Sequence, residues 1–418
     1  MGRPKDLGRD GGDAGQPVAA AAVELRLDPK HWRRRRGMSR LLAALGAKDG
    51  LTRYVGGAVR DGLLGLPVND VDLATRLLPD EVVERLQAAG LKAVPTGIEH
   101  GTITAVSDGH PYEITTLRRD VETFGRRATV AFTDDWKEDA ARRDFTINAL
   151  MADPVTGEVF DYFDGIADLE QRHLRFIGDP FERIAEDHLR ILRFFRFHAR
   201  FGRGDPDGAA LAACRQRAND LMALSRERIA DELTKLLSVD DPVPTVKVML
   251  DAAILKPVLP EIAPDAWQAL KALIEAERAA ACPGDPLRRL SALLPRDPAV
   301  AADIAARLKL SNKARKRLAC AASSAIADDP RETAYRDGSE CAVDRLLLAD
   351  RSADAAAVAA WPVPRLPVGG GALIKRGVSE GPMVSRTLRA IEDRWIAAGY
   401  PDGADLDAIV TDAVAAAR

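Results

Sequence analysis

Residues 53–72 read RYVGGAVRDGLLGLPVNDVD, and this segment sets the expected architecture. Residues 53–55 predict a short β-strand, the glycine pair at 56–57 predicts a tight turn, and residues 58–64 predict a helix. This order of strand, glycine turn and helix indicates a mixed α/β unit.

Further strand signals follow this segment. Residues 102–106 and 112–117 are rich in side chains that favour strands. Between them stands Asp108-Gly109, a strong signal for a β-hairpin. We therefore assign residues 38–170 to one mixed α/β unit.

The rest of the chain is expected to be helical. After about Asp168 the strand signals disappear, and patterns with a period of 3.6 residues follow at 182–200, 209–238, 244–281, 297–327, 338–360 and 383–398. Residues 1–37 are predicted to be a flexible tail, with a basic run at 33–36 that is typical of a solvated surface. The expected fold class is α+β, with an all-α part after the mixed unit.

The composition is that of an ordinary globular protein. A length of 418 residues favours about three domains. The chain has 60 basic and 63 acidic residues, 46% hydrophobic residues and 29% charged residues, which excludes disordered and fibrous classes. No apolar run approaches the length of about 18 residues that a membrane span needs. The first residues lack the apolar core of a secretory signal, so we expect a cytoplasmic protein.

The cysteines and histidines exclude several kinds of site. Cys214, Cys282, Cys320 and Cys341 lie far apart, without the spacing of a disulfide scaffold or a structural zinc site, and are expected to be small buried hydrophobic residues. All six histidines precede residue 199. An HD-type phosphohydrolase domain, which needs histidine ligands, is therefore excluded from the C-terminal half.

Three acidic residues are candidates for a metal site. Asp70 and Asp72 stand two residues apart, and in a strand this spacing directs both carboxylates to one face. Alone, such a pair is common at strand ends and in turns. Glu113 interrupts a β-prone run and can face the same way. Because Mg²⁺ prefers oxygen ligands and paired ions serve nucleotidyl transfer, we expect these acids to form a magnesium site.

The glycine turn is a candidate phosphate site. Gly56 and Gly57 let backbone N–H groups approach a ligand closely, and the helix that opens at Ala58 directs its positive end at an anion. Arg60 is expected to reach the oxygens of a triphosphate. A glycine pair before a helix is usually only a turn, so this signal needs support from other motifs.

Four motifs in order resemble those of a known family. They are residues 56–61 (GGAVRD), 70–72 (DVD), 143–150 (RDFTINAL) and 186–190 (EDHLR). Together they resemble the class II tRNA nucleotidyltransferase/poly(A) polymerase family. The resemblance implies a polymerase-β-like nucleotidyltransferase head at 38–170, a helical neck with a base-recognition helix at 171–240, and a helical, RNA-binding body and tail at 241–418. It also implies two Mg²⁺ ions and nucleotide addition without a nucleic-acid template.

The resemblance assigns roles to side chains of the head. Asp70 and Asp72 would hold the metals, and Glu113 would be the third acid. The residues that would bind the triphosphate and ribose of the incoming nucleotide are Gly57, Arg60, Arg143, Asp144 and Asn148. Outside such a motif, the adjacent charges at 143–144 would indicate only a surface ion pair.

The predicted helix 182–200 carries the candidates for base recognition. On a helical wheel its apolar side chains face one way, and Arg190, Arg193 and Arg196 face the other. Asp187 and Arg190 alone would fit an intrahelical salt bridge worth about 0.3 kcal/mol. The resemblance makes them a template that accepts from the exocyclic amine, and donates to the ring nitrogen, of cytosine and adenine, whereas guanine and uracil present the reverse. Arg193 and Arg196 would contact phosphates.

Three functions stay open at this point. CCA addition from CTP and ATP to the 3′ end of tRNA is favoured by the near-neutral charge and by the full-length segment 118–144, which is expected to be short in members that add only C. A bacterial poly(A) polymerase shares all four motifs. An inactive RNA-binding relative would have lost Asp70 or Asp72. The expected partners are tRNA, CTP and ATP, with a basic cluster at 313–317 as a further RNA contact; no membrane and no protein partner is implied.

Overall fold

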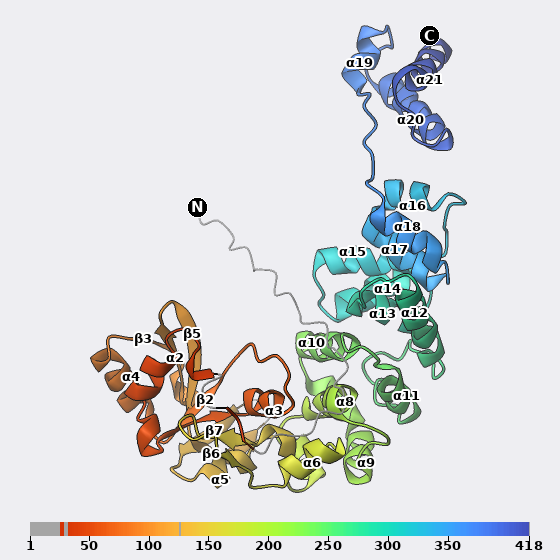
Figure 1. Ribbon diagram of the computed structural model, residues 1–418. Helices are drawn as coiled ribbons and strands as arrows, with labels where there is room; N and C mark the ends of the chain where they lie inside the picture. The colour runs from red at the N-terminus through yellow and green to blue at the C-terminus, as the bar shows by residue number, and fades with distance from the viewer. Residues whose placement is uncertain (1–25, 29–31, 125–126, 418) are drawn as a thin grey trace.

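The computed structural model describes residues 26–28, 32–124 and 127–417. It shows a head that contains all the strands, a series of helices that rises beside it, and a last group of three helices at the opposite end (Figure 1). Every element from Gly165 onward is helical. The fold is therefore α+β, which confirms the predicted class.

A seven-stranded mixed sheet forms the centre of the head. Its order is β3-β4-β5-β2-β1-β8-β9. β2 and β5 are parallel, and the other neighbours are antiparallel. The strands are β1 Thr52–Val55, β2 Leu73–Thr75, β3 Lys92–Gly97, β4 Thr102–Ser107, β5 His110–Thr116, β8 Met151–Ala152 and β9 Val159–Phe160. Asp108 and Gly109 both have positive φ between β4 and β5, which confirms the predicted hairpin.

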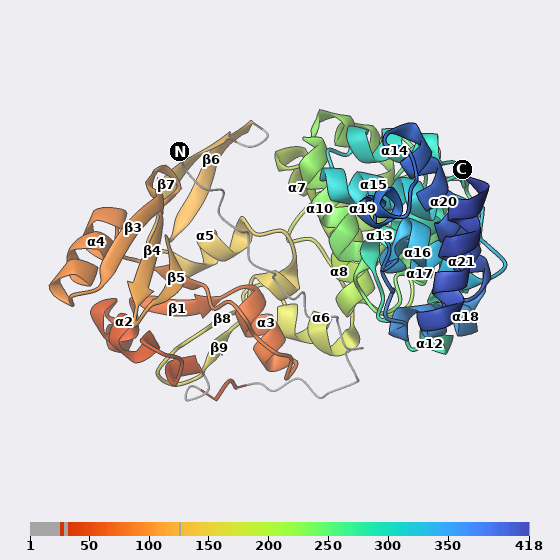
Figure 2. The same ribbon diagram turned by 90° about the horizontal axis from the view of Figure 1, so that it is seen from above.

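The helices of the head lie around the sheet, and those of the neck stand beside it (Figure 2). They are α2 Met38–Ala44, α3 Gly57–Leu63, α4 Pro79–Ala88, α5 Trp136–Ala141, α6 Gly165–Gln171, α7 Pro180–Glu186, α8 Arg190–Phe201, α9 Gly208–Gln216 and α10 Arg226–Leu237. Short 3₁₀ helices occupy Ala47–Asp49, Ile98–His100, Thr146–Asn148 and Ala218–Ala223.

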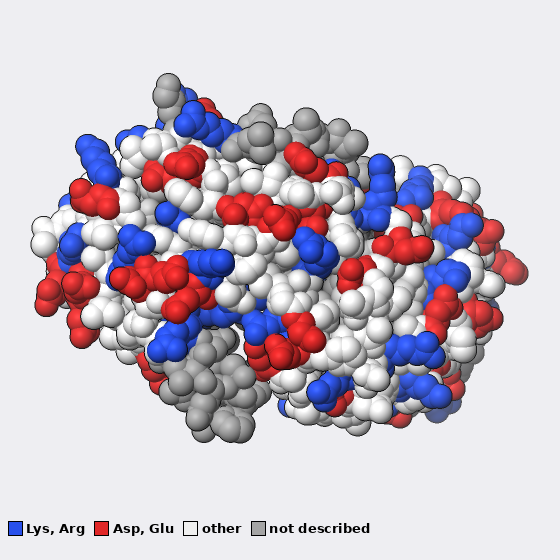
Figure 3. Space-filling view, turned by 90° about the horizontal axis from the view of Figure 1, so that it is seen from below, with Lys and Arg blue, Asp and Glu red and all other residues white. Residues whose placement is uncertain are grey.

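The remaining helices form the body and the C-terminal group. Those of the body are α11 Val243–Asp251, α12 Trp267–Ala279, α13 Pro286–Leu293, α14 Pro298–Arg307, α15 Asn312–Ala321, α16 Pro330–Asp337, α17 Ser339–Leu348 and α18 Ser352–Ala360. The C-terminal group is α19 Gly370–Lys375, α20 Pro382–Ala397 and α21 Gly403–Ala416. On the face seen in Figure 3, Lys and Arg lie beside Asp and Glu, so neither sign of charge dominates this face.

One hydrophobic core runs from the head through the neck into the first body helices. Phe145, in the motif at 143–150, is fully buried and lies 4.8 Å from Phe176 and 5.4 Å from Phe197 between ring centroids. Phe197 belongs to α8. These rings therefore fix the motif of the head against the first long helix of the neck.

The structure corrects the predicted lengths of the helices. The expected helix 182–200 is two helices, α7 and α8, because Asp187 is extended with φ −146° and ψ 105°. The predicted helices 209–238, 244–281, 297–327 and 338–360 are likewise divided, whereas 383–398 agrees with α20. The hydrophobic pattern with a period of 3.6 residues continues across these breaks because successive helices pack their apolar faces against the same core.

Three expectations about the head also change. Residues 1–25 and 29–31 of the predicted tail lie outside the described residues, but Leu27 and Trp32 are buried and belong to the head. Asp70 and Asp72 precede β2 and do not lie within it. The segment 118–144 is no irregular loop, since it forms a hairpin of β6 Arg118–Phe124 and β7 Arg127–Phe132, followed by α5.

The cysteine prediction is correct only in part. Cys214 is buried, as expected, but Cys282 is partly exposed. Cys320 of α15 and Cys341 of α17 form a disulfide, contrary to the prediction. The sequence spacing missed it because the pairing depends on two helices that meet only in the folded body. In the described part of the chain, no helix has the length and apolar character to cross a membrane.

Candidate active site

The glycine turn between β1 and α3 is packed against the motif at 143–150. Gly56 has φ 67° and ψ −132°, a conformation suited to glycine, and its N–H donates to the carbonyl of Leu150 at 3.0 Å. A Cβ at this position would lie 2.9 Å from Nη1 of Arg143. The missing side chain therefore lets Arg143 reach the turn where Gly57 begins α3.

Arg60 is buried beside this turn and is only 5% exposed. Its Nε and Nη2 each lie 2.7 Å from Oδ1 of Asp61, and Nη1 donates to Oδ1 of Asn148. Burial lowers the pKa of Arg60, although the charge of Asp61 acts against this. Arg60 thus holds Asn148, and the predicted contact with a triphosphate requires it to exchange partners.

Asp144 is the centre of a buried polar cluster. Its Oδ1 accepts from the N–H of Phe145 at 2.9 Å and from Nδ2 of Asn148 at 3.0 Å, and its Oδ2 accepts from Nε of Arg193 at 2.8 Å. Burial alone would raise the pKa of Asp144, but Arg193 and Asn148 hold it below its usual value. The head motif is thereby joined to α8 by an ionised pair.

The three predicted acids come together at the edge of the sheet. Asp70 and Asp72 directly precede β2, and Glu113 lies in β5. The parallel register of β2 and β5 places Asp72 and Glu113 side by side. Partial loss of water raises the pKa of Asp72, Glu113 and Asp70 raise it further, and Arg143 acts in the opposite sense.

The break between α7 and α8 positions the predicted base template. Oδ1 of Asp187 accepts from the N–H of Leu189 at 3.1 Å, directly before α8 begins. Oδ2 of Asp187 accepts from Nη2 of Arg228 in α10 at 2.7 Å. Arg190 instead pairs with Glu186 of α7. Asp187 and Arg190 therefore do not form the intrahelical salt bridge that their spacing alone would favour.

The other predicted arginines of α8 have acidic partners. Nε of Arg196 donates to Oε2 of Glu232 at 2.6 Å, and Nη1 of Arg193 lies 4.0 Å from Oε1 of the same residue. Glu232 belongs to α10 and is 3% exposed. Arg196 is thereby held against α10 and lies outside the two cavities described next.

Two cavities meet at Asp72. The first, of about 460 Å³, is lined by nine of the predicted site residues: Gly57, Arg60, Asp72, Arg143, Asp144, Asn148, Asp187, Arg190 and Arg193. The second, of about 670 Å³, is lined on its acidic side by Asp70, Asp72 and Glu113. The first cavity is lined by several arginine side chains, which are positively charged and can donate hydrogen bonds to a nucleotide. The second cavity is lined by carboxylates.

The acids suit a divalent cation by their chemistry. Asp70, Asp72 and Glu113 supply hard oxygen donors beside one cavity, and their mutual repulsion would be relieved by positive charge. Among the described residues, no three acidic, histidine or cysteine side chains stand close enough to enclose a metal ion by themselves.

Sequence reasoning missed Arg228, Glu232 and Arg35. The first two lie on α10, which faces α8 across the neck, and their spacing of four residues on one helix was the available signal. Arg35 lines the second cavity together with Arg36, although their basic run was predicted to be a solvated surface. Only the fold shows that these two of the four successive arginines lie beside the acids.

Comparisons with known families match two parts of the chain. Residues 52–175 match the family described as "Poly A polymerase head domain". Residues 206–266 match the family described as "Probable RNA and SrmB- binding site of polymerase A". The first match contains both glycines, the three acids and the motif at 143–150.

Comparisons with individual proteins cover most of the chain. It is 34% identical over 396 residues to CCA tRNA nucleotidyltransferase 1, mitochondrial, of Mus musculus, an alignment that covers 87% of each protein. It is 39% identical over 221 residues to the CCA-adding enzyme of Leuconostoc citreum, covering 52% of this chain and 53% of that one. The crystal structure of the Bacillus stearothermophilus CCA-adding enzyme in complex with CTP superposes with a TM-score of 0.65 and 27% identity, covering 87% of this chain and 93% of that one.

Proposed function

Because this chain belongs to the class II tRNA nucleotidyltransferase/poly(A) polymerase family, we propose that it adds C, C and A in turn to the 3′ end of tRNA, from CTP and ATP, with release of pyrophosphate. It is a nucleotidyltransferase, and the CCA-adding relative that aligns with most of its length supports this reaction over poly(A) addition. The observation that carries the proposal is the first cavity. Its lining brings the residues that we expect to bind phosphate together with Asp187 and Arg190, the expected base template, and it includes Asp72.

The incoming nucleotide would lie with its triphosphate near the glycine turn. Gly57, Arg143 and Arg193 line this part of the cavity, and arginine suits phosphate because it donates hydrogen bonds in pairs. Asp144 and Asn148 would fix the ribose and orient Arg193. Arg60 would support Asn148 from beneath, and Arg196 would support α8 through Glu232.

The base would meet Asp187 and Arg190. Oδ2 of Asp187 is already ordered by Arg228, and Arg190 is ordered by Glu186 and by the carbonyl of Arg142 at 3.1 Å. A held carboxylate and a held guanidinium match the donor and acceptor of cytosine and adenine. Guanine and uracil would place an acceptor against the carboxylate and a donor against the guanidinium, which disfavours GTP and UTP.

Asp70 and Asp72 would hold Mg²⁺, with Glu113 as the third acid. When bound, the ions would neutralise charge on the triphosphate and favour in-line attack at the α-phosphorus. The new bond joins the terminal 3′ oxygen to that phosphorus, and the bond to pyrophosphate breaks. The chain's own residues would align the α-phosphorus beside Asp72 and hold the leaving pyrophosphate with the arginines of the first cavity.

The test is product length on tRNA that lacks its 3′ CCA. We expect CTP to be required first, then ATP, and addition to stop after three nucleotides. Asp72→Asn should abolish incorporation of both C and A at saturating Mg²⁺ while the far-UV circular dichroism spectrum is retained. Long A-tails on unstructured RNA without use of CTP would support a poly(A) polymerase instead.

A cytoplasmic location, expected from the sequence, remains part of this proposal. The name of the mouse relative gives a mitochondrial location for that protein. Disulfides are rare in reducing cytosol, so in that compartment Cys320 and Cys341 should be recovered as thiols after rapid alkylation of cells.

A further inference from the structure

The basic run at 33–36 lies against the catalytic acids. Arg35 donates from Nη1 to the carbonyl of Asn69 at 2.6 Å and also to the carbonyl of Val68. The hydroxyl of Tyr112 in β5 donates to the carbonyl of Arg36 at 2.7 Å. This segment is therefore tied both to the loop that carries Asp70 and Asp72 and to the strand that carries Glu113.

The second cavity is bounded by opposite charges. Arg35 and Arg36 line it together with Asp70, Asp72 and Glu113. Its volume of about 670 Å³ falls within the range of sites for small molecules, about 300–1,000 Å³. In the proposed function the acids hold Mg²⁺, so a ligand of this cavity needs an oxygen atom that can approach the metal ions. It also needs an anionic group for the arginines.

Arg36 is the arginine of this cavity whose guanidinium has no partner among the described residues. The side chain of Arg35 is occupied by backbone carbonyls. The side chain of Arg36 is exposed, and no described residue forms an ion pair or hydrogen bond with its guanidinium. Arg34 is also exposed but does not line the cavity. Arg36 is thus the available anion-binding group beside the acids.

The relation of the two cavities indicates which ligand lies in the second. Asp72 lines both of them. In-line transfer needs the attacking oxygen and the leaving pyrophosphate on opposite sides of the reacting phosphorus. If the nucleotide fills the first cavity, the attacking 3′ hydroxyl has to arrive from the second.

With the 3′-terminal nucleotide of the RNA acceptor beside the acids, as the proposed reaction requires, we propose that Arg36 contacts the phosphate that joins this nucleotide to the preceding one. This assignment rests on the proposed function. Positive charge from Arg36 would also reduce the repulsion between an RNA backbone and three nearby carboxylates. Arg35 acts as a positioning residue, because it fixes the loop before β2 through backbone carbonyls.

The test is a double-mutant cycle on binding, which needs no turnover. One partner is Arg36→Gln, and the other is tRNA lacking CCA whose last internucleotide phosphate is a neutral methylphosphonate. In the wild-type protein the neutral phosphate should weaken binding about five- to twentyfold. In Arg36→Gln the same replacement should change binding less than twofold. Arg36→Lys should restore part of the charge effect.

Arg34→Gln is the matched control, since it removes the same charge one position earlier on an exposed side chain. It should keep the full methylphosphonate effect, and both Gln variants should melt at the wild-type temperature. In a plot of log K for RNA binding against the logarithm of the salt concentration, the slope should become shallower by about 0.7 in Arg36→Gln. In Arg34→Gln the slope should stay as in the wild type.

Equal methylphosphonate effects in wild type and Arg36→Gln would overturn the assignment. A raised KM for CTP with unchanged RNA affinity would also overturn it, because Arg36 would then serve the triphosphate or pyrophosphate. A wild-type protein that binds tRNA but adds neither C nor A would refute the proposed function, while the binding cycle would still decide the role of Arg36.

Discussion

Asp144 connects two parts of the candidate site through one buried carboxylate. It is 7% exposed and accepts hydrogen bonds from Arg193, Asn148 and the backbone of Phe145. The motif at 143–150 and α8 come from different parts of the chain, and this carboxylate connects them. Its charge therefore matters for the shape of the nucleotide cavity.

We predict that Asp144→Asn lowers the free energy of unfolding by about 2 kcal/mol at pH 7, because Arg193 loses its charged partner. In the folded protein the pKa of Asp144 is held below its usual value. The stabilisation by its ionised carboxylate is therefore present above about pH 4, the ordinary pKa of the unfolded side chain, and it declines as the pH falls below that value. Urea unfolding at pH 7 and pH 3 measures the difference. Asp231→Asn, in an exposed ion pair with Lys235, is the control and should have little effect. A difference that persists at pH 3 would contradict the prediction.

Arg228 is the second residue whose role can be isolated. Its Nη2 donates to Oδ2 of Asp187, whereas Oδ1 of Asp187 accepts from the N–H of Leu189. We predict that Asp187→Ala reduces the ratio of kcat/KM for CTP over UTP about tenfold or more, and that Arg228→Gln reduces the same ratio by a smaller factor. Single-nucleotide incorporation on tRNA lacking CCA measures both.

Lys235→Gln is the control on the same helix, because Lys235 is exposed and pairs only with Asp231. It should leave the ratio unchanged. If Asp187→Ala weakens CTP and UTP equally, Asp187 serves triphosphate binding or folding and not base choice.

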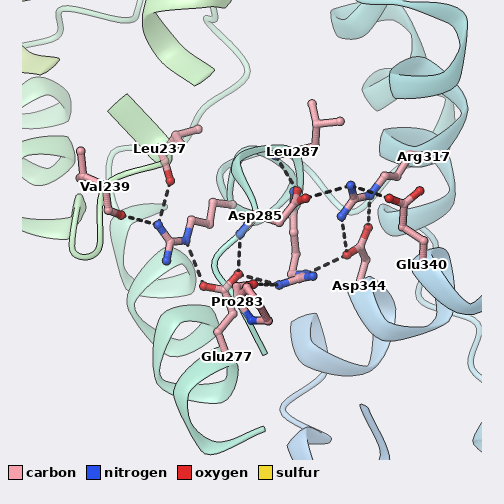
Figure 4. A network of polar contacts seen from close by, with 11 residues as sticks. Leu237, Val239, Glu277, Pro283, Asp285, Leu287, Arg317, Glu340 and Asp344 are labelled. Carbon is pink, nitrogen blue, oxygen red and sulfur yellow. Dashed lines mark hydrogen bonds and ion pairs between the residues drawn. The ribbon is translucent and has the colours of Figure 1, made fainter. Parts of the chain in front are cut away.

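At the scale of elements, α10 connects the site to the body. Its first turns carry Arg228 and Glu232, which contact the neck side of the cavity. Beyond its other end, Nη1 of Arg289 in α13 donates to the carbonyls of Leu237 at 2.8 Å and Val239 at 2.5 Å (Figure 4). The same helix thus contacts Asp187, the proposed base-template residue, and joins the body.

The joint between neck and body is a buried network of charges (Figure 4). Glu277 of α12 accepts from Nε of Arg289 at 3.0 Å and from Nη1 of Arg288 at 2.8 Å. Arg288 and Arg317 both donate to Asp344 of α17. A Cβ at Gly284 would lie 2.2 Å from Nη2 of Arg289, so glycine is required where this side chain passes.

We predict that Arg289→Met lowers the free energy of unfolding by about 3 kcal/mol, because Glu277 keeps a buried charge with one partner fewer. Hydrogen exchange at the C-terminal end of α10 should accelerate, since two carbonyls lose their donor. Arg278→Met, an exposed arginine on α12, is the control. Unchanged exchange in α10 together with lower stability would place the effect within the body alone.

These elements also mark what the sequence could predict. The glycine turn, the hairpin at Asp108-Gly109 and the acids were identifiable because each depends on local chemistry. The break at Asp187 was not, because Ile184 and Ile191 lie seven residues apart and keep one apolar face across it. The inward turn of Arg317 toward Asp344, within a cluster predicted to contact RNA, depends on a helix that follows later in the chain.

On the scale of the whole molecule, the C-terminal helices are a nearly separate unit. They have their own core, which includes Leu373, Ile391, Trp395 and Val410. Their contacts to the body centre on α16, where the hydroxyl of Tyr335 donates to Glu392 at 2.7 Å. Figure 1 places this group at the end of the molecule opposite the head.

This arrangement separates the two cavities from the C-terminal helices. Both cavities are lined only by residues of the head and neck, up to Arg228. We predict that removal of residues 365–418 leaves KM for CTP unchanged and weakens binding of tRNA about tenfold through lost backbone contacts. Binding of a short single-stranded RNA with the same 3′ sequence should change less than twofold, because such an RNA ends before it reaches the C-terminal helices. Fluorescence anisotropy with both RNAs measures this difference.

Equal weakening of binding for both RNAs would show that the deletion disturbs the head. No change for either RNA would exclude the C-terminal helices from the RNA interface.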